Sequence, residues 1–283
     1  MQVVPTIAEL HAALAVMRAR QKSIGLVPTM GALHAGHLSL VRAARAQCDA
    51  VVATIFVNPT QFGPNEDFSK YPRTFDADRN LLEAQSVDIL FAPSNEEMYP
   101  AGASSFVDVE GVGDRLDGAS RPGHFRGVAT IVAKLFHLVG PDKAFFGQKD
   151  AAQVAVLRKM VRDLNFPLEI IVCPIVREPD GLALSSRNRY LSPEERRHAL
   201  ILRRTLRSME EQAAKGITDA STLLEAGLQT FSDDSAARLD YLKIVDPDVL
   251  LDVETTEKGA LVAIAAWVGS TRLIDNFVIP PKP

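Results

Sequence analysis

The sequence predicts an α/β protein in which an open parallel sheet is flanked by helices and followed by a smaller α+β domain. Short apolar runs alternate with helical segments from the beginning of the chain to about Val176. One of these runs, Val51–Val57, is apolar throughout, as in strands that are covered on both faces of a parallel sheet. After Val176 helices come first and strands follow, which is typical of a separate α+β fold.

The first helix is expected over Ile7–Arg20, because Thr6 can cap it and Glu9 stands three residues further on. A strand over Ile24–Pro28 follows, then a turn and a helix that opens near His37. The later elements of this part are expected as strand Val51–Val57, helix Phe75–Gln85, strands Val87–Ala92 and Phe106–Val109, an irregular stretch from Gly111 to Gly123, helix Val128–Leu138, strand Lys143–Phe146, helix Ala151–Leu164 and strand Ile170–Val176. Right-handed crossovers between such strands build a Rossmann-like sheet.

A boundary is expected at Val176, which divides the chain into domains of residues 1–176 and 177–283. The second domain begins with a polar, arginine-rich loop, Arg177–Arg189. A serine cap followed by proline, at Ser192 and Pro193, predicts a helix that runs to about Lys215. The remaining elements are expected to be helix Ala220–Phe231 and strands Tyr241–Val245, Ala260–Val268 and Leu273–Val278. This smaller domain would form a lid or a wall.

Composition indicates an ordinary globular protein. The 283 residues exceed the roughly 250 at which single cores stop growing, and 47% are hydrophobic. A net charge of −4 gives no reason to expect nucleic acid or an anionic membrane as a partner. The chain begins without the pattern of a secretory signal and has no apolar run of about 18 residues, so we expect a cytoplasmic protein. Cys48 and Cys173 are expected to be free core thiols.

The turn after the strand Ile24–Pro28 has the features of a phosphate site. Gly31 and Gly36 let the backbone come close to a ligand, because neither has a side chain that would hold the ligand away. The following helix offers N–H groups and the positive end of its dipole to an anion. His34 and His37 are three residues apart, so both rings can lean toward one point. We therefore predict that this turn holds a triphosphate and stabilises the charge that develops when it reacts.

Two other interpretations of the histidine pair are open at the level of the sequence. The rings could only cap or pack the beginning of the helix, or they could bind a metal ion. The metal interpretation lacks a nearby cysteine or carboxylate to complete a ligand set.

Polar residues also follow other strands, at the edge where open α/β sheets bind ligands. Gln61 and Gln153 are neutral amides, which can bind a carboxylate or hydroxyls without burying a charge. Lys149 could reach a phosphate and Asp150 ribose hydroxyls, although the two could also be a surface ion pair. The loop Leu182–Arg187 brings two hydroxyls and a guanidinium, which suit the oxygens of a leaving pyrophosphate unless the loop is simply solvated.

Four motifs occur in one order: VPTMGALHAGHLSLV (27–41), FVNPTQF (56–62), FFGQKD with Gln153 (145–153) and GLALSSRNRYL (181–191). They closely resemble the pantothenate synthetase family, the pantoate–β-alanine ligases of the HxGH nucleotidyl-transferase superfamily. The resemblance implies that ATP activates (R)-pantoate as pantoyl adenylate with release of pyrophosphate, and that β-alanine then displaces AMP to form pantothenate. It also implies Mg²⁺, small-molecule substrates only, and a homodimer.

The resemblance assigns roles to residues at matching positions. His34, His37, Lys149 and Arg187 would act on the reacting phosphates, with His37 as the proton donor. Gln61 would bind pantoate and lie near the entering β-alanine, and Gln153 would bind pantoate. The ATP site would consist of Met30, Gly31, Ala32, Leu33, His34, Ala35, Gly36, His37, Gly147, Gln148, Lys149, Asp150, Val176, Leu184, Ser185, Ser186 and Arg187. Asn58 would support the pantoate side, and Asp76 and Asp78 are candidates for the metal, whose ligands the motifs do not identify.

Two rival functions are kept beside the ligase. A nucleotidyltransferase of the same superfamily would transfer AMP to a phosphorylated acceptor and leave it attached to the product. A non-catalytic adenine-nucleotide sensor would bind ATP without turnover. The paired histidines and the Ser-Ser-Arg loop argue against the sensor, because binding in the ground state does not require them.

Overall fold

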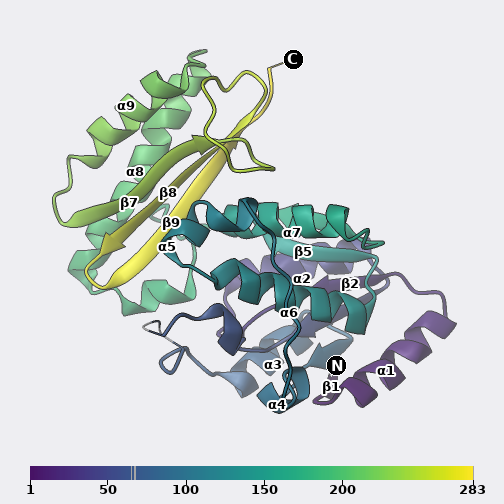
Figure 1. Cartoon of the computed structure of the whole chain (residues 1–283). Helices are drawn as coiled ribbons and strands as arrows, with labels where there is room; N and C mark the ends of the chain where they lie inside the picture. Colours follow the sequence, from purple (N-terminus) through teal and green to yellow (C-terminus); the bar gives the residue numbers. More distant parts are fainter. Residues whose placement is uncertain (65, 67, 283) are drawn as a thin grey trace. The chain divides into compact units, whose positions relative to one another are not determined.

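The computed structural model of the chain describes residues 1–64, 66 and 68–282, and its ribbon is drawn in Figure 1. The chain divides into two compact units. The first consists of residues 1–147 and 156–173, and the second of residues 148–155 and 174–283.

A six-stranded sheet forms the centre of the first unit, and all of its neighbouring strands are parallel. Its order is β1-β4-β3-β2-β5-β6. The strands are β1 (Gln2–Val4), β2 (Ile24–Val27), β3 (Ala50–Thr54), β4 (Ile89–Phe91), β5 (Lys143–Gly147) and β6 (Glu169–Cys173). The chain moves from β2 to β3 and β4 on one side, and later to β5 and β6 on the other. The strand order therefore reverses at β2, which is the usual place for a ligand in an open sheet.

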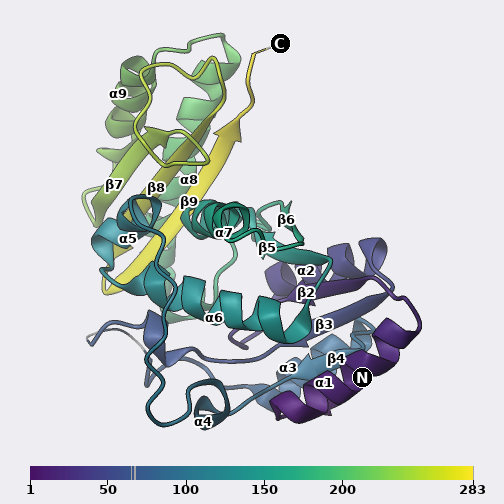
Figure 2. The ribbon, with the colours of Figure 1, turned by 45° about the vertical axis from the view of Figure 1, so that its right-hand side comes forward.

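Helices cover both faces of this sheet, as Figures 1 and 2 show. The helices of the first unit are α1 (Ile7–Ala19), α2 (Ala35–Gln47), α3 (Phe75–Ala84), α4 (Asn95–Met98), α5 (Asp117–Ser120) and α6 (His124–Val139), with 3₁₀ turns η1 (Pro59–Gln61) and η2 (Val112–Asp114). Helix α1 packs with α6 on one face, and α2 packs with α3 on the other. Helix α7 (Ala151–Asp163) begins in the second unit and ends in the first.

The core of the first unit lies between the sheet and helices α2 and α3. It contains Val27, Leu33, Leu40, Val41, Ala44, Cys48, Val51, Ala53, Leu82, Val87, Leu90, Phe145 and Cys173. Leu33 lies in the turn from Gly31 to His37, which carries both histidines and is called the histidine turn below. One side of this turn is therefore anchored in the core. Cys48 and Cys173 are free and buried, as expected, and burial raises the pKa of both thiols.

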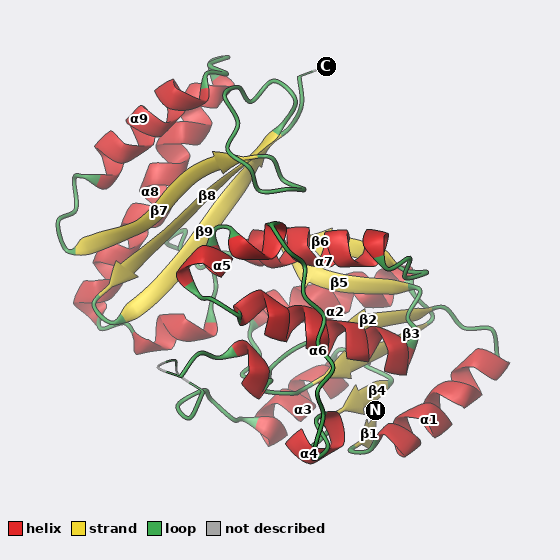
Figure 3. Cartoon of the chain, in the orientation of Figure 1, coloured by secondary structure: helices red, strands yellow, loops and turns green. Residues whose placement is uncertain are grey.

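The second unit is a three-stranded antiparallel sheet packed against two helices, which Figure 3 draws in yellow and red. Its strands are β7 (Ala237–Val245), β8 (Ala260–Val268) and β9 (Thr271–Ile279), and its helices are α8 (Pro193–Ala214) and α9 (Ala220–Phe231), with 3₁₀ turns η3 (Gln148–Asp150) and η4 (Ser186–Tyr190). Ser192 caps α8 by accepting the backbone N–H of Glu195, as predicted. The predicted order of helices followed by strands is thus confirmed.

Several predicted elements were wrong in their extent or existence. No strand forms over Phe106–Val109; instead Val107 donates its backbone N–H to the Thr130 hydroxyl at 2.9 Å. Helix α6 begins at His124 rather than Val128, and two short helices interrupt the stretch expected to be irregular. The short strand β1 was not predicted.

Helix α2 begins at Ala35, earlier than the expected opening near His37. The reason is that His34 itself is the N-cap, and its ring accepts the backbone N–H of Gly36 at 3.2 Å. In the part of the chain that is described, no helix has both the length and the apolar character needed to cross a bilayer.

Candidate functional site

A buried carboxylate holds the turn that carries the two histidines. Asp78, only 2% exposed, accepts the backbone N–H of Ala32 at 2.9 Å and that of Leu33 at 2.8 Å. Thr74 donates its hydroxyl to the same carboxylate at 3.0 Å. Gly31 and Ala32 both have positive φ, +80° and +50°, and the second is unfavourable for a residue with a side chain. Asp78 therefore stabilises a tight turn that the backbone alone disfavours.

Both histidine rings are tied to the backbone through the same type of atom. His34 Nδ1 accepts the N–H of Gly36, and His37 Nδ1 accepts the N–H of His34 at 3.3 Å. A backbone N–H can only donate, so each neutral ring carries its proton on Nε2. The ring centroids lie 4.1 Å apart, which confirms that the two rings gather at one place. His34 does cap the helix, but this use of Nδ1 leaves Nε2–H as the donor of each ring.

The side-chain amide of Gln61 has a defined orientation because Asn58 fixes it. Asn58 is 1% exposed and donates from Nδ2 to the Gly127 carbonyl at 3.1 Å and to Gln61 Oε1 at 3.1 Å. Its Oδ1 accepts the Tyr99 hydroxyl at 2.8 Å. A carbonyl can only accept, so the amide of Asn58 cannot be reversed without breaking these bonds. Gln61 consequently turns its Nε2 away from Asn58, where Met30 Sδ lies 3.0 Å from it.

The main chain of Gln61 is held by His124, in the first turn of α6. His124 Nδ1 lies 2.8 Å from the Gln61 carbonyl, and Nε2 lies 2.9 Å from Nη1 of Arg121. Since the carbonyl accepts and the guanidinium donates, the ring is neutral with its proton on Nδ1. Burial, together with the nearby Arg121 charge, lowers the pKa of His124 from its ordinary 6.5 to about 4.

This shift predicts a loss of stability in mild acid. Between pH 6.5 and 4 the unfolded chain takes up a proton at His124 and the folded chain does not, so the free energy of unfolding falls as the pH decreases. For this partly buried ring we expect a contribution of roughly 1–2 kcal/mol between pH 7 and pH 5. Urea unfolding of the wild type and of His124→Asn at both pH values measures it. Equal losses in the two proteins would contradict the prediction.

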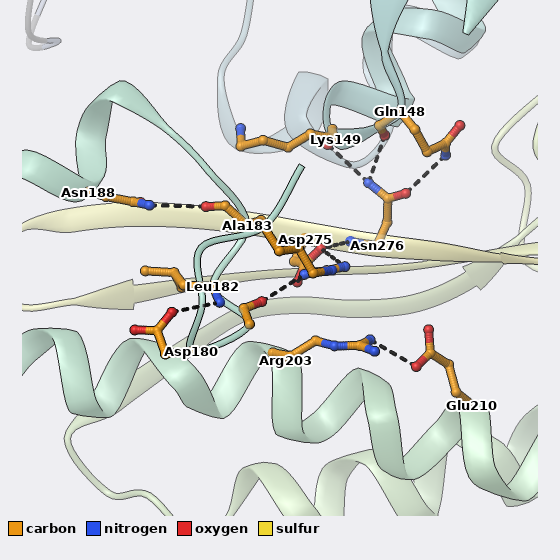
Figure 4. Close-up of polar contacts among 12 residues, drawn as sticks. Gln148, Lys149, Asp180, Leu182, Ala183, Asn188, Arg203, Glu210, Asp275 and Asn276 are labelled. Atoms are coloured by element: carbon orange, nitrogen blue, oxygen red, sulfur yellow. Dashed lines mark hydrogen bonds and ion pairs between the residues drawn. The ribbon is translucent and has the colours of Figure 1, made fainter. Parts of the chain in front are cut away.

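In the second unit, the turn of Gln148 and Lys149 is fixed by Asn276 of strand β9 (Figure 4). Asn276 is 3% exposed and donates from Nδ2 to the carbonyls of Gln148 and Lys149, both at 3.0 Å. Its Oδ1 accepts Gln148 Nε2 at 2.9 Å. The side chain of Lys149 lies 3.4 Å from Asp150, so the ion pair of the alternative interpretation is present. At that distance it is a loose pair, and it does not exclude a ligand on Lys149.

The loop that follows β6 is attached to the neighbouring position of the same strand. Arg177 forms a bidentate ion pair with Asp275, at 2.6 and 3.0 Å, and also donates to the Gly181 carbonyl. Asn188 donates to the carbonyl of Ala183 at 3.1 Å, as Figure 4 shows. Leu184 donates its N–H to the Val176 carbonyl at 2.9 Å. These bonds give the loop of Leu184–Arg187 a defined shape within the second unit.

The remaining sequence candidates fall in these same segments. Ser185 caps the 3₁₀ turn η4 by accepting the N–H of Arg187 at 3.3 Å. Gln153 lies in the first turn of α7 and is partly buried.

Among the described residues, no group of three or more His, Cys, Asp and Glu side chains could hold a metal ion. Asp76 is 87% exposed at its side chain, and Asp78 is already engaged by two backbone N–H groups.

Sequence reasoning missed the residues that support the site. His124 lay between the stretch expected to be irregular, which ended at Gly123, and the helix expected from Val128. Asn276 lay inside a predicted strand with nothing to mark it. Asp78 was considered only as a metal candidate. The one available signal was Gly123 before His124, a residue suited to a helix boundary, since Gly123 has a φ of +81°.

The fold and the first turn together define a class of protein. A parallel sheet whose order reverses beside a glycine-bearing turn, with two imidazole donors at a helix N-terminus, belongs to a nucleotide-binding α/β enzyme. The sequence profile of the family described as "Pantoate-beta-alanine ligase" matches residues 2–278. The chain belongs to the pantoate-beta-alanine ligase family.

Individual relatives agree with this assignment. A pantothenate synthetase of Acidobacterium capsulatum is 63% identical, with 98% of this chain and 97% of the relative covered. The crystal structure of the Thermus thermophilus pantothenate synthetase is similar with a TM-score of 0.94 at 50% identity, covering 99% and 100% of the two chains. That of the Francisella tularensis ligase, complexed with beta-gamma ATP and beta-alanine, gives 0.80 at 35% identity, covering 98% and 97%. The predicted fold class, family and ligase activity are thereby confirmed.

Proposed function

We propose that His34 and His37 stabilise the polyphosphate of ATP while this ligase activates the carboxylate of pantoate as pantoyl adenylate. The observation that carries the proposal is the pair of rings whose Nδ1 atoms are bound to backbone N–H groups, so that both protons are on Nε2. A carboxylate that attacks the α-phosphate meets negative charge. Preorganised donors offset this repulsion most strongly in the transition state. We assign His37 as the proton donor to the reacting phosphate. The neighbouring ring, His34, is assigned to the phosphates as well.

Other residues are assigned to the same substrates. Gln61, whose Nε2 is turned away from Asn58, is a donor to an oxygen of pantoate and lies near the entering β-alanine. Gln153 is assigned to pantoate as well. The remaining ATP contacts are assigned to Met30–Gly36, Gly147–Asp150, Val176 and Leu184–Arg187, with Lys149 and Arg187 on phosphate oxygens and Asp150 on the ribose.

Mg²⁺ is assigned to the substrate rather than to a protein site. Mg²⁺ is commonly bound through substrate phosphates and keeps several waters. The described residues provide no three-ligand group, and Asp78 holds the histidine turn with both of its oxygens. Mg²⁺ bound to ATP would lower the charge on the phosphates, and this chain's own donors would orient them.

We further propose the domain roles and the location that the sequence predicts, together with the dimer that the family resemblance implies. Residues 1–176 would bind nucleotide and pantoate, and residues 177–283 would form the smaller lid domain. The protein would act as a homodimer in the cytoplasm. Sedimentation at enzyme concentrations used in assays tests the dimer.

One assay distinguishes the ligase from its two rivals. Purified protein is mixed with ATP, Mg²⁺ and pantoate, and the acyl adenylate is trapped before amine is added. We expect pyrophosphate and pantoyl adenylate in this first step, and free AMP and pantothenate only after β-alanine. AMP that remains attached to a phosphorylated acceptor would indicate the nucleotidyltransferase, and ATP binding without any turnover would indicate the sensor.

The assignment of Gln153 predicts a selective defect. Gln153→Ala should weaken pantoate binding by about tenfold, the effect of losing one hydrogen bond to a charged group, and should leave ATP affinity unchanged. Titration calorimetry with each substrate measures both affinities. Gln229→Ala, at an exposed position of α9, is the matched control. Equal pantoate affinity in both variants would remove Gln153 from the site.

A further inference from the structure

The first turn of α6 contacts the segment of Gln61 at three places. The ring of His124 is bonded to the Gln61 carbonyl at 2.8 Å. The Gly127 carbonyl accepts the Asn58 amide that orients Gln61. At Gly127 itself, an added Cβ would lie 2.3 Å from the Thr60 carbonyl oxygen and 2.7 Å from Gln61 Cα. Such close approach is possible only for glycine, so the helix backbone lies directly on the η1 turn.

His124 is itself held in a single orientation. Arg121 donates to its Nε2, and the same guanidinium forms a bidentate pair with Glu66, with Nε–Oε1 at 2.7 Å and Nη2–Oε2 at 2.6 Å. The side chains of Arg121 and Glu66 are 16% and 25% exposed. The guanidinium is therefore fixed, and it keeps the proton of His124 on Nδ1, toward Gln61.

We infer that His124 is a positioning residue for Gln61: its Nδ1–H holds the main chain of the η1 turn so that the Gln61 amide is presented to the acid substrate. This inference rests on the proposed role of Gln61. Asn58 determines which way the amide faces, whereas His124 determines where the residue that carries it lies. His124 itself is not assigned to a substrate.

The inference predicts a pantoate-specific defect that a conservative variant rescues. His124→Phe keeps a ring but loses the donor, and the Kd for pantoate should rise by about five- to tenfold, with ATP affinity unchanged. In His124→Asn the amide nitrogen can take the place of Nδ1, so the Kd should return to within about twofold of the wild type. His124→Gln, whose amide falls nearer to the place of Nε2, should behave like His124→Phe and serves if the phenylalanine variant does not fold.

A double-mutant cycle separates positioning from general destabilisation. If His124 acts through Gln61, then His124→Phe should cause no further loss of pantoate affinity in a Gln61→Ala background. An equal loss in both backgrounds, or no effect of His124→Phe on the wild type, would overturn the inference. If Gln61→Ala alone leaves pantoate affinity unchanged, the proposed role of Gln61 fails instead, and His124 has nothing to position.

Discussion

Replacing His37 with alanine should lower kcat by about 10²–10³, the usual loss when one donor to a transition state is removed. The physical reason is the position of the proton: with Nδ1 bonded to the His34 N–H, the neutral ring carries its proton on Nε2. In the proposed mechanism this Nε2–H donates to the developing charge. Donation that strengthens only in the transition state changes kcat more than KM. Single-turnover formation of pantoyl adenylate measures the affected step directly.

Two variants control for the structural part of this effect. His37→Asn places an amide oxygen near the position of Nδ1, so it can still accept the His34 N–H, but it has no distal donor. It should be as slow as His37→Ala while remaining folded. His11→Ala, at an exposed position of α1, should retain full activity. An unchanged adenylation rate in His37→Ala, or wild-type activity in His37→Asn, would remove His37 Nε2–H from the mechanism.

Replacing Asp78 with asparagine should destabilise the first unit by about 2–4 kcal/mol, because a buried acceptor of backbone N–H groups becomes a donor on one side. The two N–H groups belong to Ala32 and Leu33, so the damage is centred on the histidine turn. Amide hydrogen exchange of residues 31–33 should accelerate. Denaturant unfolding followed by circular dichroism measures the loss of stability.

The same helix provides the matched control for this experiment. Asp76 is two residues earlier and its side chain is 87% exposed, so Asp76→Asn should stay within about 0.5 kcal/mol of the wild type. If Asp78 were instead a ligand of Mg²⁺, Asp78→Asn would change the Mg²⁺ dependence of the rate and leave exchange at residues 31–33 unaltered. Coincident unfolding curves for the two variants would contradict the structural role.

The sequence was sufficient to predict strands that are marked by continuous apolar residues and helices that are marked by a capping residue. Continuous apolar runs identified the central strands, and Ser192-Pro193 located the beginning of α8 correctly. The strand predicted over Phe106–Val109 does not form, because alternating apolar residues alone do not show whether a partner strand is available. Instead, the Thr130 hydroxyl accepts the backbone N–H of Val107. The beginning of α6 was predicted too late because its N-cap is Gly123, which has no side chain to accept a backbone N–H and is therefore a weaker signal than Ser, Thr, Asp or Asn.

The motifs of the site were found from sequence, whereas their supports were not. Spacing predicted that the rings of His34 and His37 come together, since helical geometry is local. The carboxylate of Asp78 reaches the turn from 45 and 46 residues away, and Asn276 reaches Gln148 from 128 residues away. Such long-range hydrogen bonds depend on how distant segments pack, which no local pattern encodes. The residue roles themselves stay predictions for the mutational tests.

Two neighbouring residues of strand β9 hold loops that the ribosome makes much earlier than β9, which affects the order in which the chain folds. Asp275 anchors Arg177, and the next residue, Asn276, anchors Gln148 and Lys149. A ribosome makes Arg177 98 residues before Asp275, and Gln148 128 residues before Asn276. Domains generally fold as synthesis proceeds, but the bonds of these two loops to Asp275 and Asn276 can form only after β9 has been made. Arrested chains that stop before Thr271 should therefore hold the histidine turn in its final form while Arg177, Gln148 and Lys149 still lack their partners on β9.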